Sequence, residues 1–164
     1  MDKPQKLFLD RMGTFAEHDG LSPIAGRLFA LLLLADQPRS LDELADTLGV
    51  SKASVSTDAR RLLERGIVER VTHTGDRRDY YELAPDFYAR IIHNRIDRWR
   101  RMQTLGNDVR AQSDELAPVA RERFRSIDDV QSFVIDRLEQ ALDEWERRTK
   151  PKKPAARTRS NTRG

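Results

Sequence analysis

The sequence has no cysteine, no long apolar run and little apolar character in its first residues. With no cysteine among 164 residues, disulfides, cysteine-ligated zinc and thiol redox sensing are excluded. The most apolar stretch, residues 29–35, is far shorter than the roughly 20 residues that cross a bilayer. The opening Met-Asp-Lys-Pro lacks the apolar core of a signal peptide. We therefore expect a cytoplasmic protein with no membrane contact.

Motifs of catalysis and metal binding are also missing. The histidines His18, His73 and His93 are isolated, and no HExxH pattern, nucleophile elbow or phosphate-binding loop occurs. Two acidic pairs in the last 40 residues are interpreted as solvated helix faces rather than as metal ligands. We expect no enzyme activity, no catalytic residue, no metal site and no cofactor.

Net positive charge is confined to the end of the chain. The net charge is +3, and residues 149–164 carry six Lys or Arg and no acid, which leaves residues 1–148 at −3. Any nucleic-acid surface on this body must therefore be local. The tail has no apolar face, so we predict that it is disordered and adds only non-specific attraction to phosphate.

The part of the chain before residue 40 has the pattern of two helices. Residues 6–19 carry an apolar stripe that includes Leu7 and Phe15 at helical spacing. Ser22 and Pro23 are typical of an N-cap and a first helical turn, because proline has no N–H to leave unpaired. The predicted inner side of this second helix is Ile24, Leu28, Leu31 and Leu32, widened by Leu33 and Leu34.

A second pair of helix signals follows. Ser40 and Glu43 have the spacing of a capping box, and Gly49 supplies the left-handed turn that ends a helix. Ser51 caps the next helix, which runs to about residue 65. Its predicted inner side is Val55, Ala59, Leu62 and Leu63, and its predicted outer side is Ser54, Thr57, Asp58 and Arg61, flanked by Lys52, Ser56 and Arg60.

Two β-like runs come next, residues 67–71 and 79–83, joined by a basic tip at residues 74–78. Helix, glycine turn, hydroxyl-rich helix and basic hairpin occur in the order of a winged helix-turn-helix, which places one helix in the DNA major groove. Small side chains let that helix approach the bases, and arginines reach phosphates or guanine. The predicted DNA contacts are Ser51, Lys52, Ser54, Ser56, Thr57, Arg60 and Arg61 on the helix and His73, Arg77 and Arg78 on the wing.

These contacts have different expected roles. Arg60 and His73 would hold the DNA backbone, and Arg77 and Arg78 would enter the minor groove. Arginines on an exposed helix are often simply solvated, and Asp58 on the groove side would oppose phosphate contact there. The DNA interpretation therefore depends on the conjunction of all four elements in one order.

The C-terminal half predicts long helices with unpartnered apolar stripes. We expect one helix at about residues 86–111, an interruption at Pro118 and a last helix capped by Ser126 that runs to residue 147. Together with residues 6–19, these stripes exceed what one small head can cover, which indicates a homodimer with Trp99 and Trp145 as interface anchors. The alternative is that the three helices pack only within one chain.

Residues 44–56 and 62–70 resemble the winged-helix core of MarR-type transcriptional regulators. The wing, residues 75–82, resembles the GbsR-like branch most, since it keeps the order Asp76, Arg78, Asp79. It departs from many members by having Tyr80-Tyr81 where they carry basic residues. The resemblance is specific over residues 21–83 and covers the rest only by helix order.

This resemblance implies a homodimer whose terminal helices form the interface and whose two recognition helices read a pseudo-palindrome. It also implies that Arg78 is the minor-groove arginine and Asp76 its orienting carboxylate. Small molecules in this family bind between the head and the dimer helices, and the GbsR-like branch suggests a quaternary amine, which an aromatic cage would hold. Phe15, Tyr88 and Trp99 are the candidates, with core packing as the alternative role.

The expected fold class is mainly α with a small β-hairpin wing, a winged helix-turn-helix head plus long dimerisation helices. We assign residues 1–20 to an N-terminal dimerisation helix, 21–84 to the DNA-binding domain, 85–148 to a helical dimerisation region and 149–164 to a disordered basic tail. The expected function is a sequence-specific, ligand-responsive repressor that binds double-stranded DNA as a homodimer. The alternatives are a winged-helix protein-interaction module without DNA contact, or an enzyme, for which the sequence shows no polar pocket.

Overall fold

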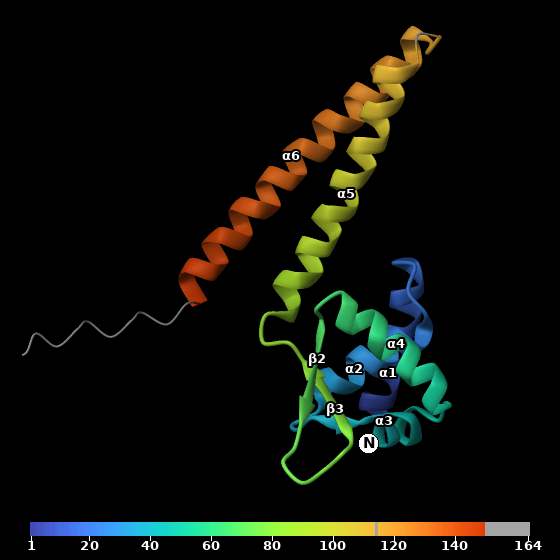
Figure 1. Cartoon of the computed structure of the whole chain (residues 1–164), viewed down its shortest axis with the longest axis vertical. Coiled ribbons are helices and arrows are strands. Elements are labelled where there is room, and N and C mark those ends of the chain that lie inside the picture. Colours follow the sequence, from blue (N-terminus) through green and yellow to red (C-terminus); the bar gives the residue numbers. More distant parts are fainter. Residues whose placement is uncertain (114, 150–164) are drawn as a thin grey trace, which may run out of the picture. The chain divides into compact units, whose positions relative to one another are not determined.

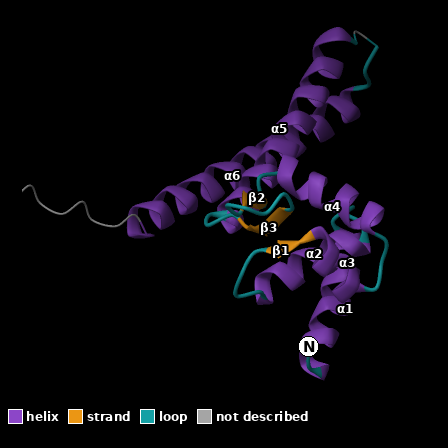
Figure 2. Cartoon of the chain, turned by 60° about the horizontal axis from the view of Figure 1, so that its bottom comes forward, coloured by secondary structure: helices purple, strands orange, loops and turns teal. Residues whose placement is uncertain are grey.

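The computed structural model describes residues 1–113 and 115–149, so nearly all of the predicted basic tail lies outside the described residues. The described part is mainly helical, with six helices and one small antiparallel sheet, and this confirms the predicted fold class (Figures 1 and 2). It forms a first compact unit, Met1–Asp97, and a second that begins at Arg98. No helix in the described residues is long and apolar enough to cross a membrane.

Helix α1 (Lys3–His18) packs on α2 (Pro23–Leu34) through small residues. A Cβ added to Gly26 of α2 would lie 2.2 Å from the Met12 carbonyl oxygen, so the two backbones touch there. This close crossing buries Leu9, Gly13 and Ala16 of α1. Leu7 and Phe15 of the predicted apolar stripe are exposed in the single chain.

Helix α2 lies in the core, as its apolar sequence predicts, but its end does not widen the buried stripe. Ser22 caps it, since its Oγ accepts the N–H of Ala25 at 3.0 Å. Leu28 and Leu32 are buried, whereas Leu33 and Leu34 are exposed because they lie on the side of α2 that faces away from the core.

The helix-turn-helix has the predicted local signals. The capping box of α3 (Leu41–Leu48) is formed by Ser40 and Glu43, and Gly49 ends this helix with a φ of 66°. Ser51 caps α4 (Lys52–Glu64) by accepting the Ser54 N–H at 3.2 Å. The helix that we predict to contact DNA is therefore fixed at both the turn and its first residues.

The sheet has three strands in the order β1-β3-β2, all antiparallel: β1 (Arg39–Ser40), β2 (Val68–Thr72) and β3 (Asp79–Leu83) (Figure 2). The hairpin of β2 and β3 is the predicted wing. The prediction missed β1, which is only two residues long and has no period of its own. Because β1 leads directly into α3, the wing is joined by backbone pairing to the helix-turn-helix.

Two long helices, α5 (Phe87–Gln112) and α6 (Pro118–Thr149), follow the wing. In Figure 1, α6 runs back along the C-terminal part of α5, where Gln103 donates to Ser132 Oγ at 2.9 Å. The prediction that Ser126 caps the last helix is wrong. Pro118 starts α6 instead of interrupting the pattern, since a first-turn proline leaves no N–H unpaired, and Ser126 lies inside the helix.

The predicted apolar side of the last helix is divided between interior and surface. Ile135 and Leu142 are buried, and Val134 and Leu138 are half-buried. Ile127, Val130, Ala141 and Trp145, which we expected on the same side, are exposed.

Candidate nucleic-acid interface

Helix α4 has one face buried and one face open. Val55, Ala59 and Leu62 are 0–1% exposed and anchor the helix in the core of the first unit. On the open side, Ser54 and Ser56 are half-buried, and Ser51, Lys52, Thr57, Arg60 and Arg61 are exposed. The structure thus brings the predicted helix contacts to one accessible side.

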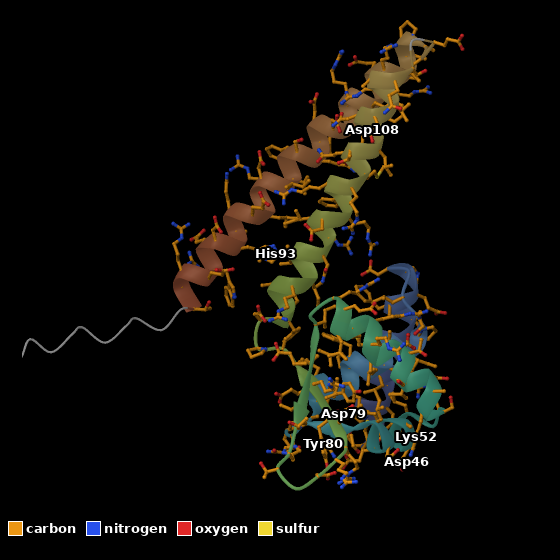
Figure 3. The ribbon with its side chains drawn as sticks, viewed as in Figure 1. Asp46, Lys52, Asp79, Tyr80, His93 and Asp108 are labelled. Atoms are coloured by element: carbon orange, nitrogen blue, oxygen red, sulfur yellow. The ribbon has the colours of Figure 1, made fainter. Side chains whose placement is uncertain are left out.

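Several of these side chains have intramolecular partners. Lys52 at the start of α4 forms an ion pair with Asp42 of α3 (Lys52 is labelled in Figure 3). Thr57 Oγ1 donates to the Ala53 carbonyl at 2.9 Å, and this leaves its oxygen free to accept only. The hydroxyls of Ser51 and Ser54 lie 2.9 Å apart. A contact with DNA would therefore replace some of these intramolecular interactions.

Asp58 is not on the outer side of α4, contrary to the prediction. It is 4% exposed, and its Oδ2 accepts the Ser22 hydroxyl at 2.7 Å, while Oδ1 accepts Arg61 Nη1 at 3.0 Å. The carboxylate thus lies at the N-terminus of α2, where the helix dipole favours negative charge. The expected repulsion of phosphate by Asp58 at the helix surface does not arise.

The sequence held a signal for this placement. Asp58 follows Val55 by three residues and precedes Leu62 by four, which is the spacing of the buried side of α4. Its charge favours the opposite placement, because a carboxylate is rarely buried without a partner. Its partners are Arg61 and Ser22. Ser22 lies 36 positions earlier in the chain, so the local sequence does not reveal this partner.

The wing tip is organised around the carboxylate of Asp76. Its Oδ1 accepts the backbone N–H of Arg78 at 2.9 Å, and its two oxygens accept Arg78 Nε at 3.0–3.1 Å and Nη2 at 2.6 Å. These bonds hold the pKa of Asp76 well below its usual range and raise that of Arg78. The expected pairing of Asp76 with Arg78 is therefore present, with Arg78 still 56% exposed.

Two aromatic rings continue this cluster onto the strands. The hydroxyl of Tyr80 donates to Asp76 Oδ2 at 2.8 Å, and the Arg78 guanidinium carbon lies 5.3 Å from the centre of the Tyr80 ring. His73 meets the same ring edge to face at 4.4 Å, while Arg77 is exposed. Figure 3 shows Tyr80 on β3, beside the tip. The sequence alone shows at Tyr80 only the lack of a basic residue, and it does not predict this hydrogen bond.

The C-terminal end of α4 is held by the first turns of α5. Arg90 Nη1 donates to the Gly66 carbonyl at 2.9 Å, and Asn94 Nδ2 donates to the Arg65 carbonyl at 2.9 Å. Arg90 also pairs with Asp86 at 2.7 Å. A positively charged side chain at the carbonyl end of a helix is favourable for the dipole. Sequence reasoning missed this contact, because the partners are 24 and 29 residues apart.

The candidate effector residues have less structural support. Phe15 and Tyr88 are exposed in the first unit, where the Tyr88 ring lies edge to face with Phe87 at 6.2 Å. Trp99 is half-buried and belongs to the second unit. An aromatic cage formed by these residues stays a prediction. Among the described residues, no cluster of three His, Cys, Asp or Glu could hold a metal ion.

Comparisons with known proteins agree with this geometry. The sequence profile described as MarR family matches residues 19–79. The chain is 35% identical over 144 residues to the HTH-type transcriptional regulator MmpR5 of Mycobacterium tuberculosis, covering 87% of each protein. It is 24% identical over 101 residues to the HTH-type transcriptional repressor GbsR of Bacillus subtilis, covering 62% of this chain and 56% of GbsR.

A solved structure shows the same fold. A crystal structure of a transcriptional regulator superposes with a TM-score of 0.77 and 32% sequence identity, over 88% of this chain and 99% of the other. An identity of 35% over 87% of both chains places this chain in the same family as MmpR5. The chain is a DNA-binding transcriptional regulator of the MarR family.

Proposed function

We propose that this chain acts as a homodimeric repressor that binds a pseudo-palindromic operator. The observation that carries the proposal is the open side of α4, whose hydroxyl and guanidinium groups are accessible while its opposite side is buried. In a two-fold dimer, the two α4 helices would enter successive major grooves about 34 Å apart. The similarity to GbsR, an HTH-type transcriptional repressor, supports repression as the sign of regulation.

Residue roles follow from reach and chemistry. Lys52, Ser54, Ser56 and Thr57 would contact base edges or phosphates of the major groove, and Arg61 would contact a base from its position beside Asp58. Arg60 and His73 would hold the DNA backbone, and Arg77 and Arg78 would enter the minor groove. Each of these side chains is exposed or half-buried.

Exposed apolar side chains support the dimer. In the second unit Val130, Phe133 and Trp145 are each 61% exposed, and in the first unit Phe15 is equally so. Such residues mark a partner surface when they are contiguous. We assign dimerisation to residues 1–20 and 85–148, and DNA binding to residues 21–84. Trp145→Ala should raise the dimer dissociation constant at least tenfold in sedimentation equilibrium, whereas an unchanged constant would remove Trp145 from the interface.

A small-molecule effector is part of the proposal. The likeness of the wing to the GbsR-like branch supports a quaternary amine, which aromatic rings would hold by cation–π contacts, and Phe15, Tyr88 and Trp99 are the candidate rings. Adding such amines to the repressor–operator complex should release the duplex. Release that persists in a Trp99→Leu variant would exclude the cage.

Selection of bound duplexes from a random pool tests DNA recognition. We expect one inverted repeat to be enriched, and gel shifts on it should show weaker binding by Arg78→Ala. Arg61→Ala should relax base preference by about 1–3 kcal/mol at one position if that contact is bidentate. Enrichment of a single asymmetric half-site, or no effect of either variant, would overturn the proposal.

A further inference from the structure

The carboxylate of Asp76 is bound from two directions. Arg78, within the wing tip, gives it one backbone and several guanidinium contacts. Tyr80 gives it a hydroxyl at 2.8 Å from outside the tip. Asp76 therefore connects the exposed arginine to a residue of the sheet.

Tyr80 is the member of this trio with a fixed backbone. It lies on β3, the central strand, and its Cα is paired with Val71 of β2 and with Ser40 of β1. Its ring also meets His73 edge to face at 4.4 Å. Residues 74–78, by contrast, belong to no strand.

We propose that Tyr80 is a positioning residue for DNA binding: it ties Asp76 to the central strand and so holds the Arg78 guanidinium in one orientation before DNA arrives. This inference rests on the proposed minor-groove role of Arg78. The centre of the Tyr80 ring lies 5.3 Å from the Arg78 guanidinium carbon. The ring therefore restricts the movement of the guanidinium from a second side.

The geometry suits a guanidinium that must bind acceptors in a groove. Asp76 occupies the Nε and Nη2 edge of Arg78, and of the five N–H donors of a guanidinium three remain for other acceptors. The minor groove offers adenine N3 and thymine O2 as acceptors. Ordering a long side chain in advance removes an entropic cost of binding that corresponds to about a 2- to 10-fold change in Kd.

The first experiment compares Tyr80→Phe with the intact protein on the selected operator. Phenylalanine keeps the ring and removes only the hydroxyl, so the operator Kd should rise about 2- to 10-fold. Tyr81→Phe is the matched control, because it makes the same chemical change one residue later, where the ring is buried in the core. We expect that control to leave the operator Kd unchanged.

A double-mutant cycle with Arg78→Ala separates positioning from general damage to the wing. The four proteins are measured at low ionic strength, where phosphate contacts keep the weakest variant bound. Tyr80→Phe should weaken binding in the intact background and have less than a twofold effect when Arg78 is absent. Equal losses in both backgrounds would overturn the inference, as would no loss in the intact protein.

The cycle also distinguishes this inference from the proposed function. If Arg78→Ala alone leaves binding unchanged, the minor-groove role of Arg78 fails. If Arg78→Ala weakens binding but Tyr80→Phe does not, only the positioning role fails. A measurement on the free protein completes the test: the Arg78 Nε–H should exchange with solvent faster in Tyr80→Phe than in Tyr81→Phe, and equal exchange rates would contradict the proposal.

Discussion

The buried carboxylate of Asp58 gives the sharpest test of how α4 is held. Asp58 accepts the Ser22 hydroxyl, which itself caps α2, and it accepts Arg61 on the exposed side of α4. Alanine at position 58 removes both bonds and leaves the Ser22 hydroxyl without its acceptor. We expect Asp58→Ala to destabilise the first unit and to release Arg61.

The expected loss in the free energy of unfolding of Asp58→Ala follows from these two contacts. A partly buried hydrogen bond to a charged acceptor contributes about 1.5–3 kcal/mol. The pair with Arg61 adds at most about 1 kcal/mol, because that side chain is 54% exposed and water screens it. Asp58→Ala should therefore lower the free energy of unfolding by about 2–4 kcal/mol.

The assay is urea unfolding followed by circular dichroism at one fixed protomer concentration, because dimerisation makes apparent stability depend on concentration. Ser22→Ala and the double variant complete a cycle. If Ser22 and Asp58 are coupled as the structure shows, the two losses should be less than additive by about 1 kcal/mol or more. Strict additivity, or a loss below about 0.5 kcal/mol for Asp58→Ala, would refute the reasoning.

Three further variants test local structure in the first unit. Gly66 has a φ of 65°, and a Cβ there would lie 2.8 Å from Arg90 Nη1 and move it away from the Gly66 carbonyl; backbone strain together with the lost hydrogen bond should make Gly66→Ala cost about 2–3 kcal/mol in thermal unfolding. Gly75→Ala has the same backbone strain but open space and should cost about 1 kcal/mol; equal costs would contradict the Arg90 contact. Hydrogen bonds from Ser40 lower the pKa of Glu43 in the folded protein below its ordinary value of 4.5. The stability that these bonds give is therefore complete above pH 4.5 and is lost as the pH falls through the lower pKa of the folded protein. Ser40→Ala removes the hydroxyl donor but keeps the backbone N–H of residue 40, which is the larger cause, so it should reduce this acid-side loss in the pH profile of unfolding without abolishing it; an unchanged profile would reject the Ser40 hydroxyl as a source.

The part of the site that sequence predicts well depends on local chemistry. Ser40 with Glu43, Gly49 and Ser51 act within one helical turn, so their spacing alone defines α3, the turn and the start of α4. The Asp76–Arg78 pair is also local, because the two residues are two positions apart. These local features predict which residues form the ends of α3 and α4 and which two residues pair at the wing tip, and the structure agrees with both.

The missed features depend on partners distant in the chain or on competing local signals. Asp58 is buried because Ser22 meets it across the fold. Pro118 and Ser126 both carry helix-start signals, and only the structure shows which one begins α6. The packing of α1 depends on Gly26 in the next helix, which favours the small residues of α1 over its large ones.

The absence of native cysteine allows one direct test of the central claim, that the open side of α4 contacts DNA. A single thiol at position 57, introduced as Thr57→Cys, should react with a soluble alkylating reagent in the free protein, since Thr57 is exposed. Thr104→Cys on α5 serves as the control, because that position is also exposed and lies outside the proposed DNA contact. We predict that the selected operator slows alkylation at position 57 at least tenfold and leaves position 104 unchanged. Equal reactivity at position 57 with and without a saturating operator would contradict the account.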